Sequence, residues 1–287
     1  MSYRRRSSPL HAARASCACV YCFALACAAL IASAPVVLAV VTIGVLGGAL
    51  GARVGRAAGR AALLALPLAV SIAVINALVN HDGLTVIARL GDLPVLGHTD
   101  VTLESLVYGG VLGLRAAALI LCGALYTAAV DPDQVLRLFR RVSFHSALTA
   151  TLATRMVPVL VRDSRRLADA QRCRPGRPAS RFELMRAASA GVLDRALDVA
   201  AALEVRGYGA ARRPPRYPAA WSRHDVWFCA SAVAVVALSV ALRVSGVTEF
   251  HAYPMLSWSI TGVGGVLCLC LLACAVLPFA DRRGIGP

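Results

Sequence analysis

The sequence predicts an all-α fold: a polytopic membrane helical bundle of about six transmembrane helices, with two long helices in the cytoplasm. Three observations predict it. Hydrophobic residues make up 58% of the 287 residues and the mean hydropathy is +0.68. A soluble domain of this size could not bury the apolar surface that such a composition carries. The apolar residues gather in runs long enough to cross a bilayer. All 30 basic residues are arginines, and they gather between alternate runs, as the positive-inside rule expects.

Six apolar runs are predicted to span the membrane. A spanning helix needs ~20 apolar residues to cross ~30 Å of hydrocarbon. The run from Ala15 to Leu50 is too long for one crossing, and Pro35 divides it into two spans joined by a tight turn. Ala32-Ser33-Ala34 resembles a signal-peptide cleavage site, but the apolar sequence continues past it, so we expect a retained helix. The predicted spans lie near residues 17–33, 36–51, 61–79, 103–130, 225–243 and 257–279.

The arginines also predict which segments face the cytoplasm. Residues 131–224 carry 18 arginines against eight acidic residues, whereas the 80–102 loop carries one arginine and the 244–256 loop carries none. Six crossings therefore place every arginine-rich segment on one side, with both termini in the cytoplasm of a multi-pass plasma-membrane protein. The predicted domains are spans one to four in 1–130, a cytoplasmic region in 131–224, and spans five and six in 225–287.

Two helices are predicted within the cytoplasmic region. Asp131 caps the first and Pro132 lies in its first turn. This helix continues, with a break near Val142 and Ser143, to Arg174, where a proline stops it. The second helix is predicted from about Ser189 to Arg206, with a glycine as its left-handed cap.

The two predicted helices end alike, each with an alanine, three further residues and an arginine. Arg174 lies a heptad after Leu167 and Arg206 a heptad after Val199, so each arginine prolongs an apolar stripe. Such an arginine suits docking into a groove that is apolar inside and acidic or carbonyl-lined at its mouth. The candidate site residues are Ala170, Gln171 and Arg174 in the first end and Ala202, Glu204, Arg206 and Gly207 in the second.

A purely structural explanation of these ends is equally open. The helix macrodipole favours an arginine near a C-terminus by ~0.3–1 kcal/mol without any partner. Glu204 shares a helical face with Leu193 and Leu197, and a local ion pair or cap accounts for it.

Several motifs together resemble the transmembrane T component of energy-coupling-factor (ECF) transporters, the family that includes the cobalt-transport permease. The two helix ends resemble the family's paired Ala-Arg-Gly motifs, although Cys173 and Pro175 replace an alanine and a glycine in the first, and Val205 replaces an alanine in the second. Three further segments resemble the family in the same order along residues 8–280: Ser8-Pro9-Leu10-His11, Val101 to Ser105 before the span with Arg115, and Thr127 to Pro132.

This resemblance implies a coupling subunit of an ABC-type importer for a vitamin or a transition-metal ion. Two cytoplasmic ATPase subunits would each hold one arginine-tipped helix, and a separate small membrane subunit would bind the substrate. The chain would join them in the lipid bilayer and would convert closure of the ATPases into a movement of the substrate-binding subunit. The resemblance leaves the substrate open, because another chain would bind it.

Other functional classes find less support. A stand-alone membrane enzyme is not expected, because the sequence has no H-E-x-x-H, no G-x-S-x-G and no lysine for a Walker A motif. His81-Asp82 and His98 offer an alternative metal site, but loop histidines are usually solvated. For a self-sufficient secondary transporter the nearest charges in the spans are Arg115 and Arg243, both expected near span ends. We expect no catalytic residue, no metal, no cofactor and no nucleic-acid partner.

Overall fold

A computed structural model describes residues 6–80, 85–93, 97–139, 144–173, 180–207, 221–251 and 256–281. The chain divides into two compact units, one formed by residues 1–135 with 221–287 and the other by residues 136–220. Each is described by itself. The first unit therefore joins the N-terminal and C-terminal parts of the sequence in one helical body.

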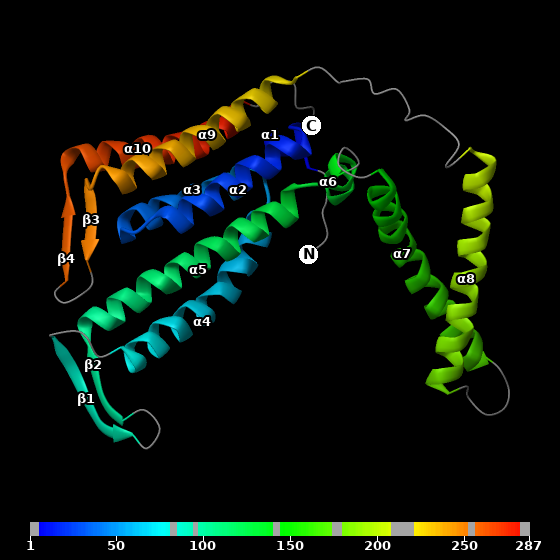
Figure 1. Cartoon of the computed structure of the whole chain (residues 1–287), viewed down its shortest axis with the longest axis horizontal. Helices are drawn as coiled ribbons and strands as arrows, with labels where there is room; N and C mark the ends of the chain where they lie inside the picture. Colours follow the sequence, from blue (N-terminus) through cyan, green and yellow to red (C-terminus); the bar gives the residue numbers. More distant parts are fainter. Residues whose placement is uncertain are drawn as a thin grey trace. The chain divides into compact units, whose positions relative to one another are not determined.

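The described part of the first unit is a bundle of apolar helices (Figure 1). Four helices are long and apolar enough to cross a membrane, and two more, α2 and α3, are apolar and 17 residues long. Seventeen residues is about the shortest span seen in bilayers, so the predicted membrane helical bundle is confirmed. The helices are α1 (Pro9–Ala12), α2 (Ala15–Ile31), α3 (Pro35–Gly51), α4 (Gly55–Val79), α5 (Leu103–Ala129), α9 (Arg223–Val244), α10 (Gly262–Val276) and the 3₁₀ helix η1 (Leu277–Phe279), with α6 (Pro132–Phe139) at the boundary between the units.

The helices of the first unit pack in a simple order. Helix α2 contacts α9 on one side and α5 on the other, α3 contacts α10 and α5, and α4 packs mainly along α5. The last contact is close because Gly109 and Gly113 face α4: a Cβ on Gly113 would lie 2.6 Å from the carbonyl oxygen of Ala69. Two small residues four apart let the helix backbones approach closely, as is common between membrane helices.

An aromatic cluster holds α2, α9 and η1 together. Tyr21 is fully buried and donates a hydrogen bond of 2.6 Å to the Ala275 carbonyl. Its ring lies edge-to-face with Phe228 and Phe279, at centroid distances of 5.2 and 5.9 Å. The hydroxyl satisfies a carbonyl near the C-terminal end of α10, where helical carbonyls lack intrahelical donors.

Two β-hairpins occur where the sequence predicted loops and the start of the last span. Strand β1 (Val86–Leu93) pairs antiparallel with β2 (Gly97–Thr102), and β3 (Thr248–His251) pairs antiparallel with β4 (Ser257–Ile260). The last predicted span therefore starts at Gly262 rather than at 257. Both hairpins lie at the end of the first unit opposite α1 (Figure 1). The buried Glu104 at the start of α5 accepts hydrogen bonds from the backbone N–H and hydroxyl of Thr85, just before β1, which fixes the base of the first hairpin.

Arg115 corrects another expectation. It lies twelve residues after Leu103 and fourteen before Ala129, near the middle of α5 rather than near an end. Its Nη2 donates a hydrogen bond of 2.7 Å to the carbonyl of Ala32, in the turn between α2 and α3. Arg243 does lie in the last turn of α9, as predicted.

The described part of the second unit contains two long polar helices, α7 (Phe144–Cys173) and α8 (Arg181–Val205). The predicted break near Val142 and Ser143 falls between α6 and α7, in residues outside the described part of the chain. Helix α8 begins eight residues before the predicted Ser189. Its start carries a capping box, in which Ser180 accepts from the Glu183 N–H and the Glu183 carboxylate accepts from the Ser180 N–H.

Candidate functional site

The first predicted helix end is described up to Cys173. Ala170 is exposed and Gln171 is half-buried on the last turn of α7. Arg172 makes an exposed ion pair of 3.4 Å with Asp169, one turn back on its own helix. Arg174, the predicted docking arginine, lies outside the described residues.

The second predicted helix end is described completely. The Arg206 N–H bonds to the Ala202 carbonyl at 3.3 Å, and the Gly207 N–H bonds to the Glu204 carbonyl at 2.9 Å. Gly207 has a φ of 75°, the left-handed conformation that glycine adopts at least cost, and it stops the helix as predicted. The side chains of Ala202, Glu204 and Arg206 are all exposed. The backbone cap does not involve the Arg206 side chain. This side chain is therefore exposed at a helix end that the backbone fixes.

Helices α7 and α8 run antiparallel and pack against each other (Figure 1). Arg195 on α8 pairs with Asp163 on α7. Asp163 lies ten residues before Cys173, and Arg195 lies ten residues before Val205. At ~1.5 Å per residue each C-terminal end extends about 15 Å beyond this contact. Because the helices are antiparallel, the two predicted docking ends lie on opposite sides of it.

The apolar stripe predicted on α7 includes Leu167, a heptad before Arg174. Leu167 and Leu160, a heptad earlier, line a cavity of about 470 Å³ at the contact with α8, together with Met185, Val192 and other residues of α8. They therefore contribute to the packing of the helix pair.

An apolar face of α8 is exposed beside this contact, and Met185 lies at its edge because it also lines the cavity. The sequence reasoning did not assign this face a role. Phe182, Met185, Leu193 and Leu197 are each 62–76% exposed. They recur at spacings of three, eight and four residues, which places them along one side of the helix. Glu204 follows Leu197 by a heptad, so this face leads to the docking end. The spacing itself was a signal for an apolar contact surface.

The alternative metal site at His81-Asp82 and His98 is not tested by the structure. His81 and Asp82 lie outside the described residues, and His98 falls in strand β2. Within the residues that the structure describes, no three His, Cys, Asp or Glu side chains are grouped to hold a metal ion. All ten cysteines are free thiols.

The chain was compared with protein families, and a cobalt-transport family matches most of it. The family model described as CbiQ, cobalt transport protein, matches residues 6–217. The match covers α1 to α8 and both predicted helix ends, and it stops before α9. No curated protein matches the chain. With most of its length matched by this model, the chain belongs to the CbiQ cobalt transport protein family, the non-catalytic transmembrane components of energy-coupling-factor transporters.

Proposed function

We propose that this chain couples two ABC-type ATPase subunits to a small substrate-binding membrane subunit, through arginines at the ends of α7 and α8. The observation that carries the proposal is the end of α8. The Arg206 side chain is exposed there, and the backbone turn at Gly207 is complete without it. The guanidinium is therefore available to a partner, and its five donors fit a carboxylate- or carbonyl-lined groove.

Arg174 has the corresponding role at the end of α7. The ends of α7 and α8 each extend about 15 Å from the Asp163–Arg195 contact, in opposite directions. Each end therefore meets a different ATPase subunit. Stiff helices held at both tips transmit the approach of the two ATPases when ATP binds. The ion pair between Asp163 and Arg195 links α7 to α8 between these two ends.

The substrate-binding subunit is proposed to contact the exposed apolar face of α8. Phe182, Met185, Leu193 and Leu197 are exposed along one side of the helix, and an exposed apolar face of this kind is typical of an interaction surface. That partner subunit, and not this chain, binds the substrate, which is a transition-metal ion or a vitamin.

The proposed orientation puts both termini and the second unit in the cytoplasm, with the chain in the plasma membrane. At one end of the bundle Arg53 donates a hydrogen bond to the Ser7 hydroxyl, and Arg14 pairs with Asp225. The N-terminal segment, the α3–α4 turn and the start of α9 thus share one end, which is rich in arginine. The positive-inside rule assigns that end to the cytoplasm.

Copurification tests the docking proposal. The chain is expressed with its ATPase subunits, and the complex is purified through a tag on the ATPase. Changing Arg174 and Arg206 together to alanine is expected to abolish recovery of the chain. Arg172→Ala is the matched control, because Arg172 is an exposed arginine near the same helix end with an ion pair of its own. Full recovery of the double variant would refute the docking role of the two arginines.

A further inference from the structure

The chain leaves the first unit after α5 and returns to it at Trp221, just before α9. Both places adjoin the beginning of α2. Helix α2 packs against α5, and the beginning of α2 lies at the same end of the bundle as the end of α5 (Figure 1). At the other junction, Arg14 directly before α2 contacts Asp225 in the first turn of α9. The beginning of α2 therefore lies between the outgoing and the returning chain.

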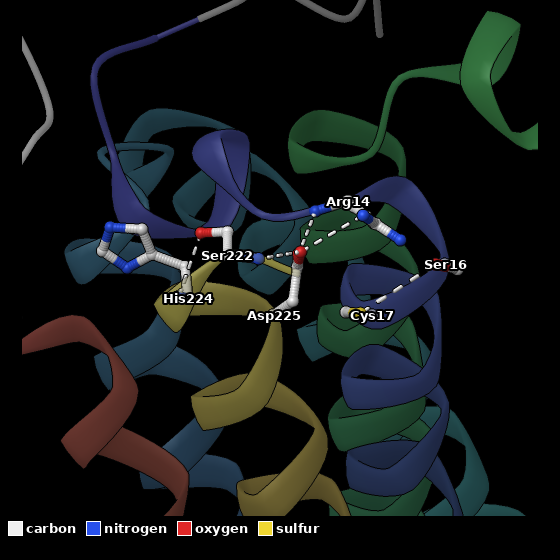
Figure 2. Close-up of polar contacts among 6 residues, drawn as sticks. All are labelled: Arg14, Ser16, Cys17, Ser222, His224 and Asp225. Atoms are coloured by element: carbon white, nitrogen blue, oxygen red, sulfur yellow. Dashed lines mark hydrogen bonds and ion pairs between the residues drawn. The ribbon is translucent and has the colours of Figure 1, made fainter. Parts of the chain in front are cut away.

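The returning chain is held by a dense set of polar contacts around Asp225 (Figure 2). The backbone N–H of Arg14 donates to Asp225 Oδ1 at 2.7 Å, and Arg14 Nε lies 3.2 Å from Asp225 Oδ2. The backbone N–H of Ser222 donates to Oδ2 at 2.9 Å. The guanidinium of Arg14 also lies over the ring of Trp221, 5.7 Å from its centroid. Trp221 and Ser222 of the returning segment and the first turn of α9 are thus held by one carboxylate and one arginine.

Burial makes this arrangement sensitive to the charge of either partner. Asp225 is completely buried, whereas the Arg14 side chain is one-third exposed. A buried carboxylate is stable only when hydrogen bonds and an opposite charge replace its lost hydration. Without the guanidinium, the Asp225 carboxylate would be buried without an opposite charge. We therefore expect the first turn of α9 to move away from α2, so that water can hydrate the carboxylate.

We propose that Arg14 and Asp225 are positioning residues that fasten the returning chain to α2. When α8 moves, α9 and α2 then move together, because the pair prevents α9 from shifting relative to α2 at the point where the chain returns to the first unit. This inference rests on the proposed coupling function and deepens it. In this inference the role of the pair is to hold α9 on α2, and the pair stays closed throughout the cycle.

Distance measurements on the assembled complex test this inference. Spin labels are introduced as unnatural amino acids at Val79 and Val244, which are exposed at the hairpin ends of α4 and α9. The distance between them is measured with and without ATP and vanadate, beside the rate of ATP hydrolysis. We expect a nucleotide-dependent shift in the unmodified chain. Asp225→Asn is expected to bind the ATPases and hydrolyse ATP as before but to lose most of the shift.

Two further variants separate transmission from folding. Arg14→Gln keeps the backbone N–H that bonds to Asp225 and removes the guanidinium with its contacts to Asp225 and Trp221, so it gives the same comparison where Asp225→Asn does not fold. Ser222→Ala removes the hydroxyl that accepts from the His224 N–H and weakens the α9 cap, but it leaves the ion pair. It is expected to lower the melting temperature and keep the shift.

The outcomes distinguish this inference from the proposed function. A complete shift in both Asp225→Asn and Arg14→Gln overturns the positioning role. Loss of the shift in Ser222→Ala to the same degree also overturns it, because general destabilisation then explains the result. Absence of any shift in the unmodified, ATP-hydrolysing complex contradicts the proposed coupling function itself.

Discussion

Arg195 on α8 and Asp163 on α7 form an ion pair, with 2.5 Å between Nη1 and Oδ2, at the contact between the two long helices of the second unit. A cavity of about 470 Å³ lies between the helices there, and Asp163 and Arg195 both line it. The ion pair thus joins the two helices where side chains do not fill the contact, and we expect it to help set the angle between them.

Arg195→Gln is expected to loosen the crossing of α7 and α8 with little loss of stability. Both side chains are more than a third exposed, so solvent screening limits the pair to ~0.2–1 kcal/mol. Spin labels at positions 173 and 205, where the native side chains are exposed, report the distance between the helix ends. The distance distribution should broaden in Arg195→Gln and stay unchanged in Arg172→Gln, which removes only a pair within α7. An unchanged distribution in the first variant would show that apolar packing alone fixes the angle.

Gly113→Ala is expected to disrupt the packing of α4 on α5. The new Cβ would lie 2.6 Å from the Ala69 carbonyl oxygen, and backbone cannot yield as a flexible side chain does. Overpacking of this kind costs about 1–3 kcal/mol, so the melting temperature in detergent should fall clearly. Gly123→Ala is the control on the same helix, because nothing lies within 4 Å of its Cβ position. Equal melting temperatures for the two variants would contradict the close helix contact.

Tyr21→Phe tests the aromatic cluster. The substitution keeps the ring contacts with Phe228 and Phe279 but leaves the Ala275 carbonyl without its donor. Loss of one partner from a buried hydrogen bond costs about 1–3 kcal/mol. Thr127→Val is the control, since the Thr127 hydroxyl bonds only to carbonyls of its own helix. A melting temperature that falls no further in Tyr21→Phe than in Thr127→Val would count against the bond to α10.

Local sequence signals account for what was predicted correctly, and the failures occur where the deciding contact is not local. Apolar runs and Pro35 located the spans, and Gly207 located the end of α8, because helix length and helix stops are encoded in adjacent residues. The Ser180–Glu183 capping box is equally local, and it was a signal for the true start of α8.

Other features depend on residues that are distant in the sequence. Arg14 and Asp225 are 211 residues apart, and no spacing pattern brings them together. Leu160 and Leu167 fit an exposed stripe as well as an internal contact until the position of α8 is known. The hairpins are short, and their strands gain stability from pairing with each other and from contacts such as Glu104 with Thr85.

Arg115→Leu is expected to change the α2–α3 turn more than the overall stability. A charged arginine inside a membrane span costs about 2.5–3.5 kcal/mol on insertion scales, and the substitution removes that cost. It also removes the 2.7 Å hydrogen bond to the Ala32 carbonyl, and leaving a buried carbonyl without a donor costs about 1–3 kcal/mol. The two terms are similar and opposite, so the melting temperature should change little, while the turn loses its link to α5.

The mobility of this turn can be measured directly. A cysteine is placed at Ser33, which is half-buried in the turn, and its reaction with a membrane-impermeant maleimide is followed in proteoliposomes. The rate should rise in Arg115→Leu, because the turn is no longer held against the middle of α5. Arg243→Leu serves as the control, since Arg243 is exposed in the last turn of α9. If the rate at Ser33 stays constant while the melting temperature falls steeply, then Arg115 supports the bundle as a whole and does not act through the turn.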